Sequence, residues 1–277
     1  MSFFICNDRF YKEGNPVITP DNRGLKYGDG LFETMKMIKG KLQLKEYHFE
    51  RLFNGMRILG FNKPLTFTPA FLEKKIIALA KKNTHSGITR IRVMVLRGNR
   101  SVTEAGSDLP DYIIQTHALT DSTSLNGKGF IIDVYPDVKK SCDILSNLKT
   151  NNFLPYTLAA RYAEKNKLND CILLNSYDKI SDTTIANIFI IKDKKIYTPS
   201  LDEGCIAGVM RRWIIEKLKT EGKDIVEKSL TIEDLKQADE VFLTNSIDPV
   251  RWVRQFQNVR YNNTQVKNIY DEIMKTF

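Results

Sequence analysis

Hydrophobic and polar positions along this chain change repeatedly between a strand spacing and a helical spacing. In the first 120 residues the strand-like segments are short, apolar and bounded by turn residues: 3–6, 10–11, 31–38, 41–44, 88–96 and 111–119. Phe49, Leu52 and Met56 recur at helical spacing. A second helix is predicted to open at Thr68, a capping residue, which is followed by a first-turn proline, Pro69. This half therefore combines helices with strands.

The second half of the chain shows the same mixture after a polar segment, residues 120–129. That segment consists of small, turn-forming residues, which is typical of a linker. Beyond it, strands are predicted at 130–135, 171–175, 187–191, 195–197 and 240–244, and helices at 156–167, 208–219 and 264–275. We therefore expect an α/β (α+β) fold with two domains, a smaller N-terminal one over 1–119 and a larger mixed one over 130–277.

The overall composition is that of an ordinary globular protein with a basic surplus. Of 277 residues, 42% are hydrophobic and 27% are charged, which excludes collagen-like, disordered and disulfide-scaffold classes. The chain has 42 Lys or Arg and 33 Asp or Glu residues, a net charge of +9. These cations are scattered, with no basic run of five and no zinc-finger spacing. We therefore expect no nucleic-acid partner.

Cysteine and histidine usage points to a reducing environment without a metal site. The four cysteines are far apart and form no Cys-x-x-Cys pair, and the three histidines are isolated. The N-terminal apolar stretch is too short for a signal peptide, and no run of about 18 apolar residues occurs. A cytoplasmic protein with no bound metal and no membrane partner is expected.

Six local strings carry the candidate chemistry, although no single generic catalytic motif is present. In chain order they are YGDGLFET at 27–34, HFERL at 48–52, SNLKTNNF at 146–153, ISDTTIANIF at 180–189, GCIAGVMR at 204–211 and FLTNS at 242–246. Lys149 is a lysine among small and amide residues, a residue type that becomes a nucleophile when burial or a nearby cation favours its neutral form. The glycine-bearing loop that opens a helix at 208 presents free N–H groups suited to an anion such as phosphate. Taken singly, a glycine turn or a helix arginine such as Arg51 has an ordinary structural explanation.

Taken together, the six strings resemble the class IV, fold-type IV family of pyridoxal-phosphate (PLP) enzymes. This family comprises branched-chain aminotransferases, D-amino-acid aminotransferases and aminodeoxychorismate lyases. The resemblance runs from about residue 23 to residue 253 and follows the family's motif order. It implies a two-domain fold-type IV architecture, PLP as cofactor, and a homodimer in which a loop of the partner's smaller domain completes the active site.

The resemblance also implies roles for individual residues. Lys149 matches the lysine that forms a Schiff base with PLP and then moves the α-proton. Arg51 matches the helix arginine that binds the cofactor phosphate. The remaining expected phosphate ligands are the backbone amides of Val209 and Met210 and the polar groups at a strand end, Thr244, Asn245 and Ser246. His48 lies beside Arg51, and we expect it to pack at the helix surface.

Asp182 departs from the family pattern, which has a glutamate at the position that pairs with the pyridine nitrogen. A carboxylate is needed there because a protonated ring nitrogen accepts the electrons of the carbanion. Aspartate supplies the charge with one methylene fewer. It must therefore lie closer, act through water, or leave the ring less protonated. We expect Asp182 to keep the catalytic role beside Lys149.

Three residues are the candidates for substrate binding. Arg97 resembles the carboxylate-binding arginine of the D-amino-acid enzymes and of the lyases, and Arg92 falls where the branched-chain enzymes have an arginine. Along a strand, Arg90 and Arg92 point to one face and Arg97 to the other. Phe32 is at a position occupied by tyrosine in D-amino-acid enzymes and by phenylalanine in the other two groups.

The predicted activity is transfer of an amino group between an amino acid and a 2-oxo acid through a Lys149 Schiff base. One alternative is a 4-amino-4-deoxychorismate lyase that releases pyruvate and 4-aminobenzoate, because residues 238–250 look most like that group. A second alternative is a degenerate PLP-binding protein without activity, which rests on the Asp182 departure. Both catalytic reactions begin with the same proton abstraction, so the substrate pocket must separate them.

Overall fold

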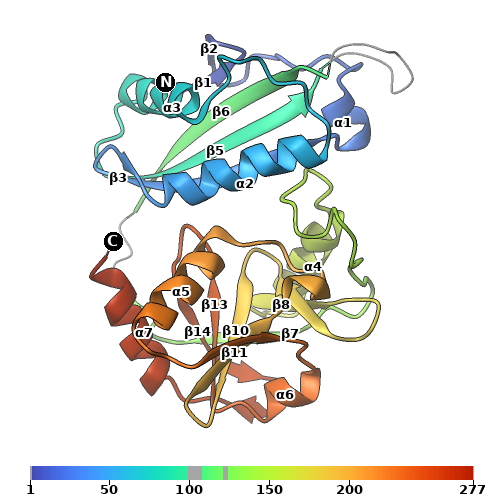
Figure 1. Ribbon diagram of the computed structural model, residues 1–277, viewed down its shortest axis with the longest axis vertical. Coiled ribbons are helices and arrows are strands. Elements are labelled where there is room, and N and C mark those ends of the chain that lie inside the picture. The colour runs from blue at the N-terminus through green and yellow to red at the C-terminus, as the bar shows by residue number, and fades with distance from the viewer. Residues whose placement is uncertain (1, 99–107, 121–123, 277) are drawn as a thin grey trace. The chain divides into compact units, whose positions relative to one another are not determined.

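The computed structural model describes residues 2–98, 108–120 and 124–276. These residues divide into two compact units (Figure 1). The first contains the described residues of 1–122 together with Lys149–Asn152, and the second contains those of 123–148 and 153–277. The short segment Lys149–Asn152 is thus separated in sequence from the unit in which it is packed. Residues 121–123 of the expected linker lie outside the described residues.

The first unit is an antiparallel sheet with helices on it. Its strands are β1 (Phe3–Cys6), β2 (Arg9–Lys12), β3 (Gly30–Ile38), β4 (Lys41–Leu42), β5 (Ile88–Arg97) and β6 (Pro110–Leu119). Its helices are α1 (Arg23–Tyr27), α2 (Lys45–Ile58) and α3 (Pro69–Lys82). Over the described residues the strand order is β2-β1-β6-β5-β3-β4, and every pairing is antiparallel. The predicted hairpin, strands and two longer helices are confirmed.

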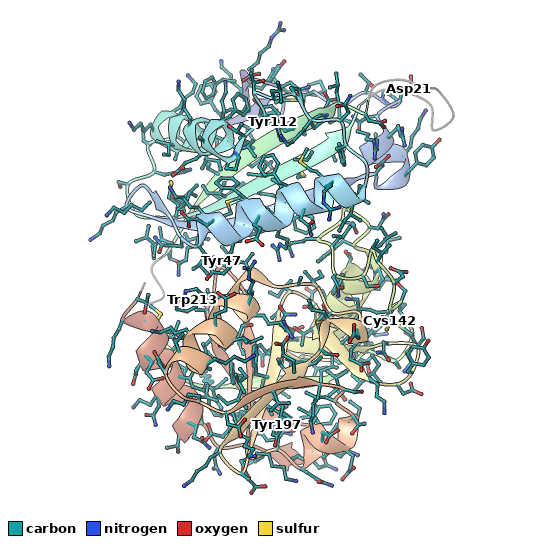
Figure 2. All side chains as sticks on the ribbon, viewed as in Figure 1. Asp21, Tyr47, Tyr112, Cys142, Tyr197 and Trp213 are labelled. Atoms are coloured by element: carbon teal, nitrogen blue, oxygen red, sulfur yellow. The ribbon has the colours of Figure 1, made fainter. Side chains whose placement is uncertain are left out.

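Local sequence explains why these elements begin and end where they do. Asn7 and Asp8 adopt positive φ angles of 43° and 71°, as a two-residue hairpin turn requires. The Thr68 hydroxyl accepts a hydrogen bond from the Phe71 N–H and caps α3, as its sequence predicted. Helix α2 packs on β3, and α3 packs on β6 and β1 (Figure 1). Tyr112 of β6, labelled in Figure 2, contacts the aromatic rings of two residues at this helix, Phe67 and Phe71.

The second unit is built on a larger, mixed sheet. Its strands are β7 (Phe130–Val134), β8 (Asp170–Leu174), β9 (Ile180–Thr183), β10 (Asn187–Lys192), β11 (Lys195–Pro199), β12 (Ile225–Lys228), β13 (Glu240–Thr244), β14 (Arg251–Phe256) and β15 (Val259–Arg260). Its helices are α4 (Leu154–Lys165), the 3₁₀ turn η1 (Leu201–Glu203), α5 (Val209–Thr220), α6 (Ile232–Lys236) and α7 (Thr264–Met274). Within the described chain the strand order is β12-β11-β10-β13-β14-β7-β8-β9, with β15 paired to β14.

The core of the second unit lies on this sheet and fixes the strand ends that concern the site. Many of its most buried residues come from strands β8, β10 and β13, including Phe189 and Phe242, whose stacked rings have centroids 4.8 Å apart. Helix α4 packs on β8 and α7 on β13 (Figure 1), and α5 packs on β12. The hydrophobic pattern missed α1, β9, β12, α6, β14 and β15, which are short or carry charged residues. None of the described helices is long and apolar enough to cross a membrane.

Residues Lys149–Asn152 extend the first sheet as a short strand-like segment beside β3. The Phe32 N–H donates to the Lys149 carbonyl at 2.9 Å, and the Asn151 N–H donates to the Gly30 carbonyl at 3.0 Å. Leu31 and Thr150 form an antiparallel bridge between these two bonds. The backbone of Lys149 is therefore held at one register against β3.

Gly30 is required for this close approach. A Cβ atom built at Gly30 would lie 2.5 Å from the Val95 carbonyl oxygen and 2.6 Å from the Asn151 side-chain nitrogen. Such separations are shorter than real Cβ contacts, and the contact with the Val95 carbonyl can be relieved only if the backbone of β3 or of β5 moves. The second glycine of the 27–34 string thus permits the packing of the Lys149–Asn152 segment.

We predict that Gly30→Ala loosens the segment that carries Lys149. Overpacking of this kind costs about 1–3 kcal/mol, so exchange of the Phe32 and Asn151 amide protons should become about tenfold faster or more. Hydrogen exchange read by NMR measures both amides. Gly87→Ala is the matched control, because nothing lies within 4 Å of a Cβ at Gly87. Unchanged protection of both amides in Gly30→Ala would contradict this description of the packing.

Candidate active site

The first group of candidate residues surrounds the Phe32 ring on β3. The Lys149 Nζ lies 4.6 Å from the ring centroid, and the Arg92 guanidinium carbon lies 4.2 Å from it. Phe32 and Arg92 share a sheet face, because Thr34, two residues after Phe32, is directly opposite Arg92. Among the described residues no carboxylate pairs with Arg92, and burial, with Arg90 nearby, lowers the pKa of Arg92. Two cationic side chains therefore meet at one aromatic ring.

Arg51 belongs to a second group, a buried ionic cluster with Glu33 and His48. The Glu33 carboxylate accepts from Arg51 Nε at 2.7 Å and Nη2 at 2.6 Å, and lies 2.7 Å from His48 Nδ1. Glu33 and His48 are each about 1% exposed. Burial opposes ionisation of Glu33, but Arg51 and His48 outweigh it and lower the pKa of Glu33 to about 2. The Arg51 guanidinium, which we expect at the cofactor phosphate, is therefore held in place by both oxygens of Glu33.

His48 does not occupy the surface position that we expected. It is 1% exposed, and burial lowers its pKa despite the neighbouring Glu33. A neutral imidazole donates its Nδ1–H to Glu33 in this arrangement. The prediction of surface packing for His48 was wrong because its partner comes from a strand 15 residues earlier in the chain.

Arg97 is already engaged by the protein. Its guanidinium is 7% exposed and pairs with Asp29 at 3.1 Å and with Asp108. The same group donates to the backbone carbonyls of Leu59 and Gly60. The pairing of β5 with β6 has no bulge, so side chains alternate between the two faces along the whole of β5. Arg97 therefore lies on the face opposite Arg92, as expected from the sequence. This geometry makes Arg97 the residue that ties the end of β5 to the end of α2.

In the second unit, Asp182 lies in a buried polar cluster on β9. Its carboxylate is 3.1 Å from the Lys140 Nζ and accepts from the Tyr156 hydroxyl at 3.0 Å. The Ile206 N–H donates to the same carboxylate at 2.9 Å. Asp182 is 1% exposed and Lys140 is 7% exposed. The carboxylate that the sequence singled out thus has three protein partners.

Helix α5 begins with amide groups available for an anion. Gly208 is its N-cap and provides no side-chain hydrogen bond, and the Val209 and Met210 N–H groups have no hydrogen-bond partner among the described residues. A Cβ at Gly208 would lie 1.9 Å from the Asn187 side-chain oxygen, so a larger residue at this position would have to displace the Asn187 side chain. Asn187 is directly opposite Thr244, whose buried Oγ1 has no partner in the described structure. A hydroxyl and a helix N-terminus are therefore both adjacent to Asn187.

The two residues after Thr244 differ in what they can offer. The Asn245 side-chain oxygen accepts from the Ile247 and Asp248 N–H groups at 2.9 and 2.8 Å, so this residue shapes a turn. Ser246 is half-buried, and in the described part of the chain its hydroxyl makes no hydrogen bond. Ser246 is therefore better suited than Asn245 to bind a phosphate oxygen.

Sequence reasoning missed the polar partners of the residues it selected. For Arg51 and Asp182 they are Glu33, Lys140 and Tyr156. Only Glu33 carried a signal, because a charged residue in the apolar run 31–38 requires a buried partner. Across the residues the structure describes, no three His, Cys, Asp or Glu side chains gather in a way that could hold a metal ion.

Comparisons with known proteins show the family to which this sequence is similar. Residues 30–256 match the family model described as amino-transferase class IV. An aminodeoxychorismate lyase of Vibrio harveyi is 30% identical over 227 residues, 82% of each protein. A D-alanine aminotransferase of Listeria innocua is 27% identical over 252 residues, covering 87% of this chain and 83% of that protein.

A solved structure confirms the predicted α/β fold. The branched-chain amino acid aminotransferase of Escherichia coli matches with a TM-score of 0.88 at 22% identity, covering 100% of this chain and 94% of that chain. At this identity the likeness concerns the fold alone. The relatives cover three named activities, so identity by itself does not select one of them.

We predict that the Glu33 cluster makes stability depend on acid. The folded-state pKa of about 2 lies below the ordinary value of 4.5, so the stabilisation is present above about pH 4.5 and is lost as the pH falls toward 2. The difference corresponds to about 3 kcal/mol. Denaturant unfolding of the wild type between roughly pH 6 and pH 2.5 should show most of this loss, since the lower pH is still slightly above the folded-state pKa.

The Glu33→Gln variant should be less stable at neutral pH and should lose less stability over the same acid range. Glu13→Gln is the control, because Glu13 is exposed and makes no ion pair in the described structure. Equal acid sensitivity of wild type and Glu33→Gln would show that other groups dominate the acid response.

Proposed function

Because this chain belongs to the class IV aminotransferase family, whose cofactor is PLP, we propose that it is an amino-group transferase acting on a carboxylate-bearing amino acid. The observation that carries this proposal is the contact of Lys149 and Arg92 with one ring, that of Phe32. It brings an amine that can move a proton beside a cation that can hold a carboxylate. An amino acid substrate presents both of the groups that these two residues would meet.

The residues present fit the cofactor on chemical grounds. The N-terminus of α5, which has no side-chain cap, and the Thr244 hydroxyl, which has no partner among the described residues, suit a phosphate. Lys149 supplies the primary amine that an aldehyde requires. We propose that Val209, Met210, Thr244 and Ser246 hold the phosphate, and that Arg51 adds a positive charge held in place by Glu33.

The proposed division of labour among the protein groups follows from their chemistry. PLP, when bound, supplies an electron-accepting ring that makes the α-proton of an amine substrate removable. Lys149 Nζ accepts that proton and returns it at another carbon, which is general acid–base catalysis by one group. Arg92 binds the substrate carboxylate in a charge-assisted hydrogen bond, and the Phe32 face restricts where the substrate can lie. Asp182 provides the negative charge for the ring nitrogen.

Arg92 is the better of the two arginine candidates for the substrate. The nitrogens of Arg97 already serve two carboxylates and two carbonyls, so a ligand at Arg97 would have to displace bonds within the protein. Arg92 stacks on Phe32, and in the described structure it has no carboxylate to give up. Branched-chain aminotransferases have an arginine at the position of Arg92. Preferring Arg92 to Arg97 as the substrate-binding residue therefore favours an aminotransferase.

Aminodeoxychorismate lysis is the second candidate, and a separate observation favours it. The Vibrio harveyi relative with that name is 30% identical over 82% of this chain. Arg90 lies two residues before Arg92 on the same face, is exposed, and has no acidic partner among the described residues. Two unpaired arginines suit a substrate with two carboxylates, and aminodeoxychorismate is one such molecule.

We predict that Arg92→Gln raises the KM for the carboxylate substrate about 100-fold, because a charge-assisted bond of about 2–3 kcal/mol is lost. The kcat should change much less, and thermal unfolding should be unchanged. Arg9→Gln is the control for removing one exposed charge from this sheet. Arg97→Gln should instead lower the free energy of unfolding. A KM that rises only in Arg97→Gln would reverse the assignment of the two arginines.

The activity itself is tested by two assays on the PLP-loaded protein. Conversion of PLP to its pyridoxamine form by L-glutamate, another L-amino acid or D-alanine is expected for an aminotransferase. Release of 4-aminobenzoate from aminodeoxychorismate, with no response to amino acids, would replace the proposal by the lyase. A protein that binds PLP and fails in both assays would be the degenerate binding protein.

A further inference from the structure

Lys140 is a buried cation whose partner is the proposed ring-nitrogen carboxylate. Its side chain is 7% exposed, and its Nζ lies 3.1 and 3.3 Å from the two oxygens of Asp182. It also contacts Tyr156, both through a hydrogen bond to the hydroxyl and with its Nζ 4.8 Å from the ring centroid. Within the described part of the chain, Asp182 is the only charged residue that pairs with the Lys140 ammonium group.

The backbone holds Lys140 in this inward position. The Lys140 N–H donates to the Leu174 carbonyl at 2.9 Å, and its own carbonyl accepts from the Ser176 N–H at 3.2 Å. Lys139, one residue earlier, points the other way and pairs with the exposed Asp178. The two neighbouring lysines thus differ in burial and partner while sharing the same local sequence, which makes Lys139 a matched comparison.

We propose that Lys140 is a positioning residue that offsets the charge of Asp182 and so limits how strongly this carboxylate draws a proton onto the cofactor's ring nitrogen. This inference rests on the proposed function, in which Asp182 faces that nitrogen. Burying an ammonium group costs several kcal/mol unless a partner compensates it, and a buried ion pair rarely adds net stability. A stabilising role alone is therefore a weak explanation for Lys140.

The hydrogen bonds already made by the two oxygens of Asp182 indicate how Lys140 would limit protonation of the ring nitrogen. Its Oδ2 accepts from Lys140, from the Tyr156 hydroxyl and from the Ile206 N–H, whereas its Oδ1 is 3.3 Å from Lys140 and has no closer partner. Among the described residues Oδ1 thus has fewer hydrogen-bond donors than Oδ2, and it is the oxygen that can accept a further one. A protonated ring nitrogen at Oδ1 would be a second positive charge close to the Lys140 ammonium, which opposes it electrostatically.

Tyr156 adds a neutral hydrogen-bond donor to the Lys140–Asp182 pair. Burial, with Asp182 beside it, raises the pKa of the Tyr156 phenol well above its ordinary value, so the hydroxyl keeps its proton. It donates that proton to Asp182 and stacks on Phe153 with ring centroids 4.3 Å apart. The hydroxyl therefore fixes the orientation of the carboxylate without changing the net charge of the cluster.

Asp182 also supports the loop that precedes α5. It accepts from the Ile206 N–H, and the Ile206 carbonyl accepts from the Asn187 side chain at 2.9 Å. A variant that merely disturbed this loop would expose the Ile206 amide to exchange. Protection of that amide therefore separates a change of charge at Asp182 from a change of structure.

The experiment uses the holoprotein loaded with PLP that carries ¹⁵N at the ring nitrogen. The ¹⁵N chemical shift reports how much of that nitrogen is protonated. We expect Lys140→Gln and Lys140→Met, which both remove the charge, to raise the ratio of protonated to unprotonated nitrogen about tenfold or more. Lys140→Arg, which keeps the charge, and Lys139→Gln should match the wild type.

A ¹⁵N shift that is the same in wild type and in whichever neutral variant folds, with the Ile206 amide still protected, would overturn the role of Lys140. A ratio that rises equally in Lys139→Gln would overturn it as well, since that lysine does not contact Asp182. Absence of bound PLP in the wild type would instead refute the proposed function, an outcome that is recognised before any variant is compared.

Discussion

The short antiparallel pairing between Lys149–Asn152 and β3 is the constraint on which the site of the first unit depends. Two backbone hydrogen bonds and one bridge join chain segments that are more than 100 residues apart in sequence. They fix Lys149 at one register, and the register decides that its side chain meets Phe32. Arg92 reaches the same ring from the neighbouring strand β5. A shift of one residue would send the lysine to the other face of the sheet.

Buried charges in both units are arranged as compensated groups. Glu33 binds Arg51 and His48, and Asp182 binds Lys140 and Tyr156. In each group a carboxylate with about 1% exposure is surrounded by close hydrogen-bonding partners, which compensate part of the cost of burying a charge. Charges held in this way cannot rearrange freely when a ligand arrives, which is the preorganisation that electrostatic catalysis requires.

The sequence predicted the parts of the structure that depend on local pattern. Strand β13, the Thr68 cap of α3 and the helix after Lys149 follow from periodicity, capping and turn chemistry, which act over a few residues. The strands β12 and β14 were missed because charged residues interrupt their apolar pattern.

The partners of the candidate residues could not be predicted in the same way. Glu33 and Arg51 are 18 residues apart, and Lys140 and Asp182 are 42 apart, so each pairing depends on how separate elements pack. Arg97 illustrates the same limit. Its motif resembles a substrate-binding position, but its guanidinium is already paired with Asp29 and Asp108. Residue type and family resemblance selected candidate positions, and tertiary packing determined which charges remain available.

The central claim is that Lys149 is the residue to which the cofactor is attached. Borohydride reduction of the PLP-loaded protein, followed by peptide mass spectrometry, locates that attachment directly. The account predicts one reduced adduct, on the peptide that contains Lys149. An adduct on Lys140, adducts spread over surface lysines, or a protein that retains no PLP would contradict it.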